Sequence, residues 1–239
     1  MLILAFETSA KAAGVALFAD GTLLAENYQN TGLTHSQTLL VMAQDLLKQC
    51  GFRPQDVHAV AVAAGPGSFT GVRIGVAAAK GLAWGLQVPC YGVSTLQSMA
   101  LGLGVYQGTV CAVMDARRSQ VYNALFSVES GVLKRLTEDR AIALADLAEE
   151  LKQMPQPIFL VGDGSALTWR TLHESVPGLV MPMESRMHQR GVGVGLAALQ
   201  AIADGQSGDA ESLQPNYLRL SQAEREKLEK EIIHTQKEI

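Results

Sequence analysis

The chain has 239 residues, of which 48% are apolar, and a formal net charge of -4. That length and composition can supply a buried core for one large domain or two small lobes, and they exclude a fully disordered chain. Because there is no basic excess, the composition argues against a protein that binds nucleic acid unaided, and we expect any RNA contact to be shared with a partner.

The N-terminal segment begins with an apolar run that Glu7 interrupts, and no basic residue precedes it. A secretory signal needs a longer apolar run behind a basic segment, and a membrane-spanning helix needs about 20 apolar residues. Cys50, Cys90 and Cys111 are widely spaced and form no CxxC pair, which is typical of reduced structural thiols. These features predict a cytoplasmic protein without membrane contact.

The first elements in chain order are a predicted three-strand meander. Residues 2–6 and 14–18 are apolar runs on either side of a short polar loop. Residues 22–28 return after Asp20-Gly21, a dipeptide that is typical of two-residue hairpin turns.

Two helices and a buried strand are predicted next. Residues 34–50 carry apolar side chains at helical spacing, and Thr34 and Gln37 have the spacing of a capping box. Residues 57–64 are almost continuously apolar, which predicts a strand buried on both faces. A glycine-rich loop follows, and a helix that is rich in glycine and alanine ends near residue 86.

The region from residue 110 onward repeats the order of the opening region. Glu7 is followed ten residues later by Leu17 in an Ala-Leu-Phe tripeptide, and Asp115 is followed ten residues later by Leu125 in the same tripeptide. Later segments alternate between helical and strand patterns, which is typical of a mostly parallel α/β sheet. The repeat predicts two similar lobes related by internal duplication.

Five motifs along the chain are specific enough to compare with known families: ILAFETS at residues 3–9, THS at 34–36, GPGSFTGVRIG at 65–75, DARR at 115–118 and PNYLR at 215–219. Together they resemble the TsaB (YeaZ) family of tRNA threonylcarbamoyladenosine biosynthesis proteins, relatives of the catalytic TsaD/Kae1 proteins. The resemblance covers nearly the whole chain.

The resemblance implies an α/β fold of two actin-like (ASKHA, RNase H-like) lobes, with mixed sheets flanked by helices. We place the first lobe at residues 1–106, the second at 107–220 and a charged tail at 221–239. In this fold, turns at the ends of the first strands face nucleotide phosphates. The corresponding residues, which we interpret as vestigial phosphate loops, are Glu7, Thr8, Ser9, Gly65, Gly67 and Asp115.

The catalytic relatives bind a metal through an HxxxH pair. The matching stretch of this chain has Thr95 and Met99 at that spacing, and neither replaces histidine as a ligand for this chemistry. Asp163, between two glycines after a later strand, would repel a nearby phosphate. We therefore expect no metal site, no catalytic residue and no cofactor held by the chain alone, and we leave ATP or ADP near the interface with a partner open.

The implied function is that of a non-catalytic scaffold and activating subunit. It would dimerise with the catalytic paralogue TsaD, support the ATPase TsaE, form a homodimer without its partner, and contact tRNA only indirectly while the threonylcarbamoyl group is placed on N6 of an adenosine in ANN-decoding tRNAs. The predicted interface residues lie on the two N-terminal helices: Leu39, Met42, Leu46, Gly71, Gly75, Ala78 and Trp84.

Two other functions stay open on the sequence. The duplicated loops permit an autonomous ATP-dependent phosphotransferase of the actin-like/sugar-kinase superfamily, in which Glu7 or Asp115 acts as general base. A metallopeptidase is the other alternative, because the resembled family has carried a glycoprotease label. It is a minor one, since the sequence has neither an HxxxH pair nor a compact cluster of histidine and carboxylate residues.

Overall fold

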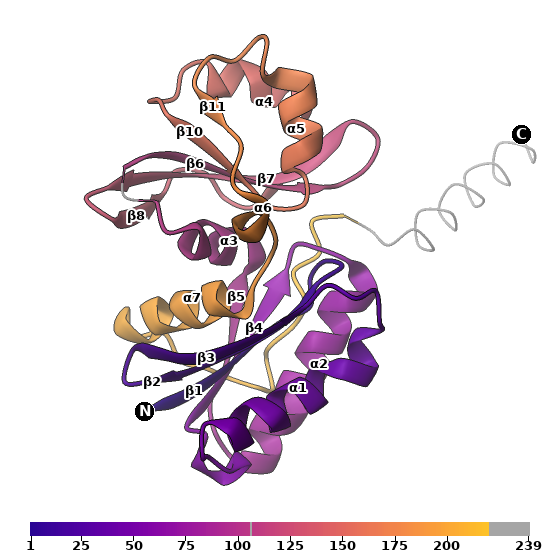
Figure 1. The fold of residues 1–239 in the computed structure, drawn as a ribbon, viewed down its shortest axis with the longest axis vertical. Coiled ribbons are helices and arrows are strands. Elements are labelled where there is room, and N and C mark those ends of the chain that lie inside the picture. The colour runs from indigo at the N-terminus through magenta and orange to yellow at the C-terminus, as the bar shows by residue number, and fades with distance from the viewer. Residues whose placement is uncertain (106, 220–239) are drawn as a thin grey trace, which may run out of the picture.

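The computed structural model describes residues 1–105 and 107–219, which form two lobes stacked one above the other (Figure 1). The first sheet has the strand order β3-β2-β1-β4-β5, and the second has the order β8-β7-β6-β10-β11 with β9 paired to β7. The strands of the first sheet are β1 (Leu2–Glu7), β2 (Ala13–Ala19), β3 (Thr22–Gln29), β4 (Ala59–Gly65) and β5 (Cys90–Ser94). Those of the second are β6 (Gly108–Asp115), β7 (Gln120–Glu129), β8 (Val132–Arg135), β9 (Arg140–Ala143), β10 (Ile158–Val161) and β11 (Leu179–Val180).

The two sheets share one topology, which confirms the predicted duplication. In each, an antiparallel meander of three strands is followed by two strands that run parallel to the first strand of the meander. Both meanders turn through two residues in the left-handed region, Asp20-Gly21 and Ser130-Gly131. Such turns match the right-handed twist of paired strands, so these dipeptides set the register of each meander.

The helices repeat in the same order and complete the predicted α/β architecture of mixed sheets flanked by helices. In the first half they are α1 (His35–Gln49), α2 (Phe69–Leu86) and α3 (Thr95–Leu103), with a short 3-10 turn η1 (Pro54–Asp56). In the second half they are α4 (Leu144–Leu151), α5 (Ser165–Leu172), α6 (Glu184–Met187) and α7 (Gly191–Ala203). Ser68 caps α2 by accepting from the backbone N–H of Gly71 at 3.3 Å. The predicted capping box of α1 is wrong, because the Thr34 side chain makes no cap hydrogen bond.

The last helix of each half covers the sheet of the other half. Side chains of α3 such as Leu96 and Met99 pack into the core of the second sheet, and side chains of α7 such as Val194 and Ala198 pack into the core of the first. The helices also touch each other, since a side chain on Gly193 would collide with the backbone of α3. The predicted lobe boundary is therefore corrected: α7 belongs to the core of the first lobe although it lies within residues 107–220.

After α7 the chain runs back along the first lobe as an extended strap, residues 208–219. The Lys80 ammonium donates to the backbone carbonyls of Glu211 and Leu213 at 3.1 and 2.9 Å, and the backbone N–H of Asn216 donates to the carbonyl of Ala64 at 2.6 Å. The predicted charged tail, residues 221–239, lies outside the described residues. Among the residues that the structure describes, no helix is long and apolar enough to cross a membrane.

Candidate functional site: the cleft between the lobes and the outer helical face

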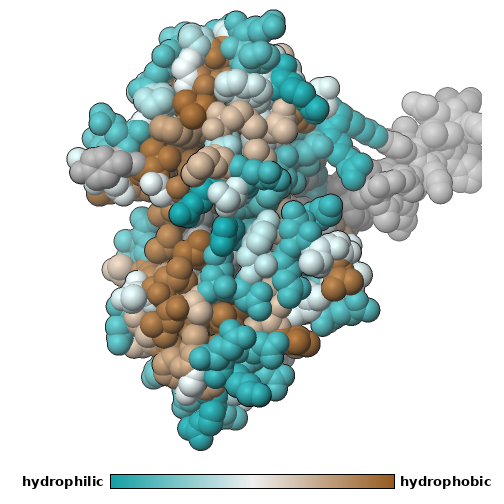
Figure 2. Space-filling model, in the orientation of Figure 1, coloured by the Kyte–Doolittle hydropathy of each residue, from teal (hydrophilic) through white to brown (hydrophobic). Residues whose placement is uncertain are grey.

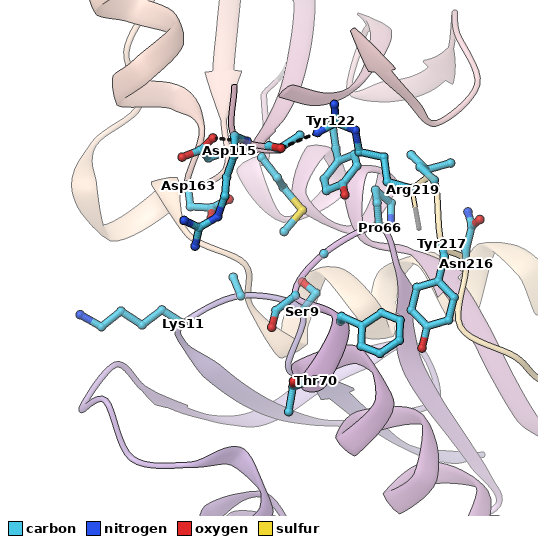
Figure 3. A pocket seen from close by; sticks show the side chains of 18 residues that line it. Ser9, Lys11, Pro66, Thr70, Asp115, Tyr122, Asp163, Asn216, Tyr217 and Arg219 are labelled. Atoms are coloured by element: carbon cyan, nitrogen blue, oxygen red, sulfur yellow. Dashed lines mark hydrogen bonds between the residues drawn. The ribbon is translucent and has the colours of Figure 1, made fainter. Parts of the chain in front are cut away.

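A cleft of about 580 Å³ opens where β1 and β6 end, between the two lobes (Figure 3). Its walls are the turn after β1, the glycine loop after β4, the turn after β6, the start of α5 and the end of the strap. The lining residues that Figure 3 labels are Ser9, Lys11, Pro66, Thr70, Asp115, Tyr122, Asp163, Asn216, Tyr217 and Arg219.

Glu7 lies beneath the floor of the cleft and is fully buried. One of its carboxylate oxygens, Oε1, accepts from the backbone N–H of Ser9 at 2.6 Å, and the other has no hydrogen-bond partner among the described residues. Burial raises the pKa of Glu7 to about 7, because the loss of solvent outweighs the hydrogen bonds from Ser9 that favour the carboxylate. The carboxyl group is thus half protonated near neutral pH.

The turn after β1 is fastened to the two N-terminal helices. The Thr8 hydroxyl donates to the carbonyl of Gly71 in α2 at 2.8 Å, and the His35 ring Nε2 lies 2.8 Å from the carbonyl of Ala10. The backbone N–H of Ser68 donates to the carbonyl of Ser9 at 2.6 Å. These contacts hold the turn as part of the packed core.

The turn after β6 has a similar hydrogen bond, but its polar side chains are exposed. The Asp115 carboxylate accepts from the backbone N–H of Arg117 at 2.7 Å, just as Glu7 accepts from Ser9. The next three residues, Arg117, Arg118 and Ser119, all have positive φ, at 63°, 55° and 57°. Residues other than glycine adopt that conformation at an energetic cost, so this turn is strained.

Asp163 adds a second carboxylate to the lining of the cleft. The Gln189 side-chain amide donates to it at 2.9 Å. Its carboxylate reaches the solvent of the cleft, but surrounding protein atoms desolvate it and raise its pKa, and the negative charge of Asp115 adds to this effect. The bottom of the cleft is therefore acidic.

The predicted phosphate-loop residues are brought to one place but do not all face the cleft. Ser9, Gly67 and Asp115 line it. Thr8 is buried and turned toward α2, and Gly65 lies beneath the strap, where an added Cβ would come within 2.5 Å of the Asn216 carbonyl. These two residues therefore shape the backbone and cannot contact a ligand.

The chemistry of this lining does not favour a metal or a phosphate deep in the cleft. The described residues contain no group of three or more histidine, cysteine or acidic side chains that could hold a metal ion. Thr95 and Met99, at the spacing of the HxxxH pair, are both buried in α3, and Met99 packs under the turn at Gly162. A phosphate on the floor would face Asp115 and Asp163.

The contribution of the strap to this site could not be read from its sequence. Tyr217 stacks on Phe69 with ring centroids 4.6 Å apart, and the Arg73 guanidinium lies 3.9 Å from the Phe69 ring centroid while donating to the Tyr217 hydroxyl at 2.7 Å. Arg219 donates to the Ala116 carbonyl at 2.6 Å and to the Gln120 side chain. The PNYLR motif therefore joins the first lobe to the turn after β6.

Most of the predicted interface residues belong to the core of the first lobe. Leu39, Met42 and Leu46 are 1–2% exposed and pack on the buried side of α1, in the core of the first lobe. An added side chain on Gly71 or Gly75 would collide with Thr8. These residues are therefore not on the exposed side of the helices, because apolar residues at helical spacing mark the buried side of a helix as readily as an interface. The interface itself stays a prediction.

The exposed side of the two helices carries a different set of residues, which we call the α1/α2 face: Leu40, Val41, Ala77, Gly81, Trp84 and Gly85. Trp84, which was predicted here, is 64% exposed, and Ala78 is partly buried at the edge of the face. Gly81 and Gly85 have nothing within 4 Å of an added Cβ. Beside the face, Leu40, Leu47, Phe52 and Leu82 line an apolar groove of about 490 Å³.

Comparison with known proteins identifies the family. The family model described as TsaD, tRNA N6-adenosine threonylcarbamoyltransferase, matches residues 29–227. A TsaB protein of Bacillus subtilis is 36% identical over 94% of this chain and 96% of its own length, and a TsaB protein of Escherichia coli is 36% identical over 92% and 95%. The solved structure of YeaZ from Pseudomonas aeruginosa has a TM-score of 0.74 at 30% identity and covers 91% of this chain and 99% of its own.

A more distant likeness supports the fold alone. The ROK hexokinase of Thermus thermophilus superposes with a TM-score of 0.50 at 14% identity, over 86% of this chain. It shares the actin-like arrangement of two lobes, as predicted from the duplicated turns. The chain belongs to the TsaB branch of the TsaD family, whose proteins serve the biosynthesis of threonylcarbamoyladenosine in tRNA.

Proposed function

We propose that this chain is a non-catalytic scaffold subunit that activates a TsaD-type catalytic paralogue by pairing with it through the α1/α2 face. The observation that carries the proposal is the exposure of Trp84, Leu40 and Val41, at 64%, 54% and 55%, on two adjacent helices. Large apolar side chains gathered on one surface are typical of a protein interface.

The shape of α2 supports close contact with another helix. Ala77, Gly81 and Gly85 recur every four residues along its exposed side, so no side chain larger than a methyl group separates the helix backbone from a partner there. Trp84 stands beside this stripe as a candidate anchor residue, since tryptophan is enriched among the residues that dominate binding energy.

The interior of the cleft supports a scaffold role in place of catalysis. Glu7, the first candidate for a general base, is buried and cannot reach a substrate in the cleft. Asp115 is accessible, but it faces Asp163 across the site where a phosphate would have to bind. These features weigh against an autonomous phosphotransferase, and the apolar and hydroxyl side chains at Met99 and Thr95 weigh against a metallopeptidase.

The same proposal covers the other partners. The resemblance implies that TsaE joins the pair, that the α1/α2 face mediates a homodimer when TsaD is absent, and that any ATP or ADP lies near the interface of the pair. A homodimer follows naturally from one exposed apolar face, because two-fold symmetry brings the same surface of each copy together.

Capture of purified TsaD by the tagged chain tests this proposal, with the variant Gly81→Leu and a matched variant on another exposed helix position, Glu149→Leu. Because Gly81 faces open space, the leucine leaves the melting temperature close to that of the wild type while it blocks approach of the partner, and capture falls at least tenfold. Glu149→Leu leaves capture intact. Undiminished capture by Gly81→Leu would place the interface elsewhere.

A further inference from the structure

Five basic side chains surround the mouth of the cleft, and we call them the basic rim: Lys11, Arg73, Arg117, Arg118 and Arg219. Lys11, Arg117 and Arg219 line the cleft, Arg118 is exposed beside Arg117, and Arg73 lies against the lining residues Phe69 and Tyr217. In Figure 3, Lys11 extends outward from the first lobe while Arg219 lies on the side of the strap. The rim thus draws on both lobes and the strap.

The charges of the rim are not neutralised within residues 1–105 and 107–219. None of the five residues has an acidic side chain within ion-pair distance there, whereas Arg53, Arg135, Arg140, Lys152 and Arg190 each have one. Arg73 and Arg219 bond only to neutral oxygens, of Tyr217, Ala116 and Gln120. Within the described part of the chain, no acidic side chain competes with an external anion for their positive charge.

The turn after β6 presents two of these arginines at a conformational cost. Arg117 and Arg118 have positive φ and exposed side chains, whereas no residue between Glu7 and Ala13, in the equivalent turn of the first lobe, has positive φ. Strained backbone of this kind clusters at functional sites, such as the loops that hold a ligand.

The position of the acidic groups indicates where an anion would lie. Asp115 and Asp163 face the interior of the cleft, so a phosphate that entered deeply would be repelled, while one at the mouth would meet the basic rim. Figure 2 shows hydrophilic surface on both lobes where they face each other on the right of the view, whereas apolar surface gathers on the left of the view. The arrangement fits an extended anion that bridges the lobes across the mouth.

We propose that the basic rim contacts the phosphodiester backbone of tRNA, laid across the mouth of the cleft from the first lobe to the second. The inference rests on the proposed function, which brings a tRNA to the complex, and it revises our expectation of indirect contact only. That expectation came from the net charge of -4, which averages over the chain and does not describe this local surface.

Binding of fluorescently labelled tRNA to the full chain, measured from about 50 to 200 mM salt, tests the inference. The slope of log affinity against log salt is negative, and each lost phosphate contact reduces its magnitude by about one. Arg117→Gln/Arg118→Gln should therefore reduce the magnitude of that slope by about two and weaken binding at least tenfold at the low-salt end. The control Lys134→Gln/Arg170→Gln removes the same charge from exposed positions outside the cleft lining and should bind as the wild type does.

Two results would overturn the inference directly: wild-type tRNA affinity in both double variants, or the same loss of affinity in both. A third is complete displacement of the tRNA by ATP at a concentration too low to change the ionic strength, which would assign the rim to a nucleotide. Capture of TsaD by the same variants separates this outcome from the proposed function. The rim variant should capture TsaD normally. The Gly81→Leu variant should lose TsaD capture but bind tRNA as the wild type does, and this pair of results would support both proposals.

Discussion

Glu7 at the end of β1 and Asp115 at the end of β6 each accept a hydrogen bond from the backbone N–H two residues on, at 2.6 and 2.7 Å, yet Glu7 is buried and Asp115 is exposed. The difference comes from what packs against each turn. The first is covered by α1 and α2. The second is held by the strap through Arg219 and by the start of α4, where the backbone N–H of Leu144 donates to the Ser119 carbonyl at 3.1 Å, and these contacts leave Asp115 exposed.

The comparison shows that two turns with the same local hydrogen bond can have different roles. The first turn has become part of the core under the helices that we propose as the docking surface. The second keeps an accessible acid and two exposed arginines at the cleft mouth. Sequence similarity between the two turns therefore predicts their backbone geometry but not their function.

The largest expected effect comes from breaking the contact between the first turn and α2. Gly75→Leu forces a side chain against the buried Thr8 and Val62, and overpacking of this kind should cost about 3 kcal/mol or more of unfolding free energy. Chemical denaturation checks this value. Gly81→Leu, which meets open space, should lose less than about 1 kcal/mol, apart from the small gain in helix propensity.

A second prediction uses the pKa of Glu7 to sharpen the contrast between the two acids. Because the folded state holds the Glu7 proton up to about pH 7 and the unfolded state releases it near 4.5, stability falls as the pH rises through that window. The total loss is about 3 kcal/mol, at 1.36 kcal/mol for each pKa unit.

Glu7→Gln removes this ionisation, so it should be more stable than the wild type at about pH 8 and lose that advantage at about pH 5. Denaturation at both pH values measures the effect, and Asp115→Asn is the control for an exposed acid. If Glu7→Gln shows the same pH dependence as the wild type, the buried carboxyl is not the group that titrates.

The smallest effect tests the equivalence of the two meanders. Gly21 and Gly131 have φ of 81° and 79° in matching hairpin turns. Replacing either with alanine should cost about 1 kcal/mol, because alanine adopts this conformation with strain. Thermal melts of the two variants should agree closely, and a large difference would show that the two turns are not under the same constraint.

The sequence predicted those parts of the fold that depend on local chemistry. Asp20-Gly21 and the repeated acid after β1 and β6 specified turns and strand order, because two-residue hairpins and short connections leave few arrangements. The packing of α7 against the first sheet could not be predicted, since an apolar helix does not reveal which sheet it covers. The strap contacts of Tyr217 and Arg219 likewise join residues far apart in the chain.

The sequence could not separate the buried from the exposed interface candidates, for a related reason. Leu39 and Leu40 are neighbours with equal hydrophobicity, yet one is 1% exposed and the other 54%. Only the packing of α1 on the sheet decides between them. The predicted phosphate-loop residues do lie near one another, because an acid or a glycine at a strand end has few structural roles, but only Ser9, Gly67 and Asp115 line the cleft.

Photo-crosslinking tests the central claim most directly. A photoreactive amino acid at position 84, on the α1/α2 face, should crosslink the chain to TsaD in the reconstituted pair, and the same amino acid at position 118, in the turn after β6, should not. Both positions are exposed in the isolated chain, so reactivity alone cannot explain a difference. Crosslinking to TsaD from position 118 with none from position 84 would contradict the account.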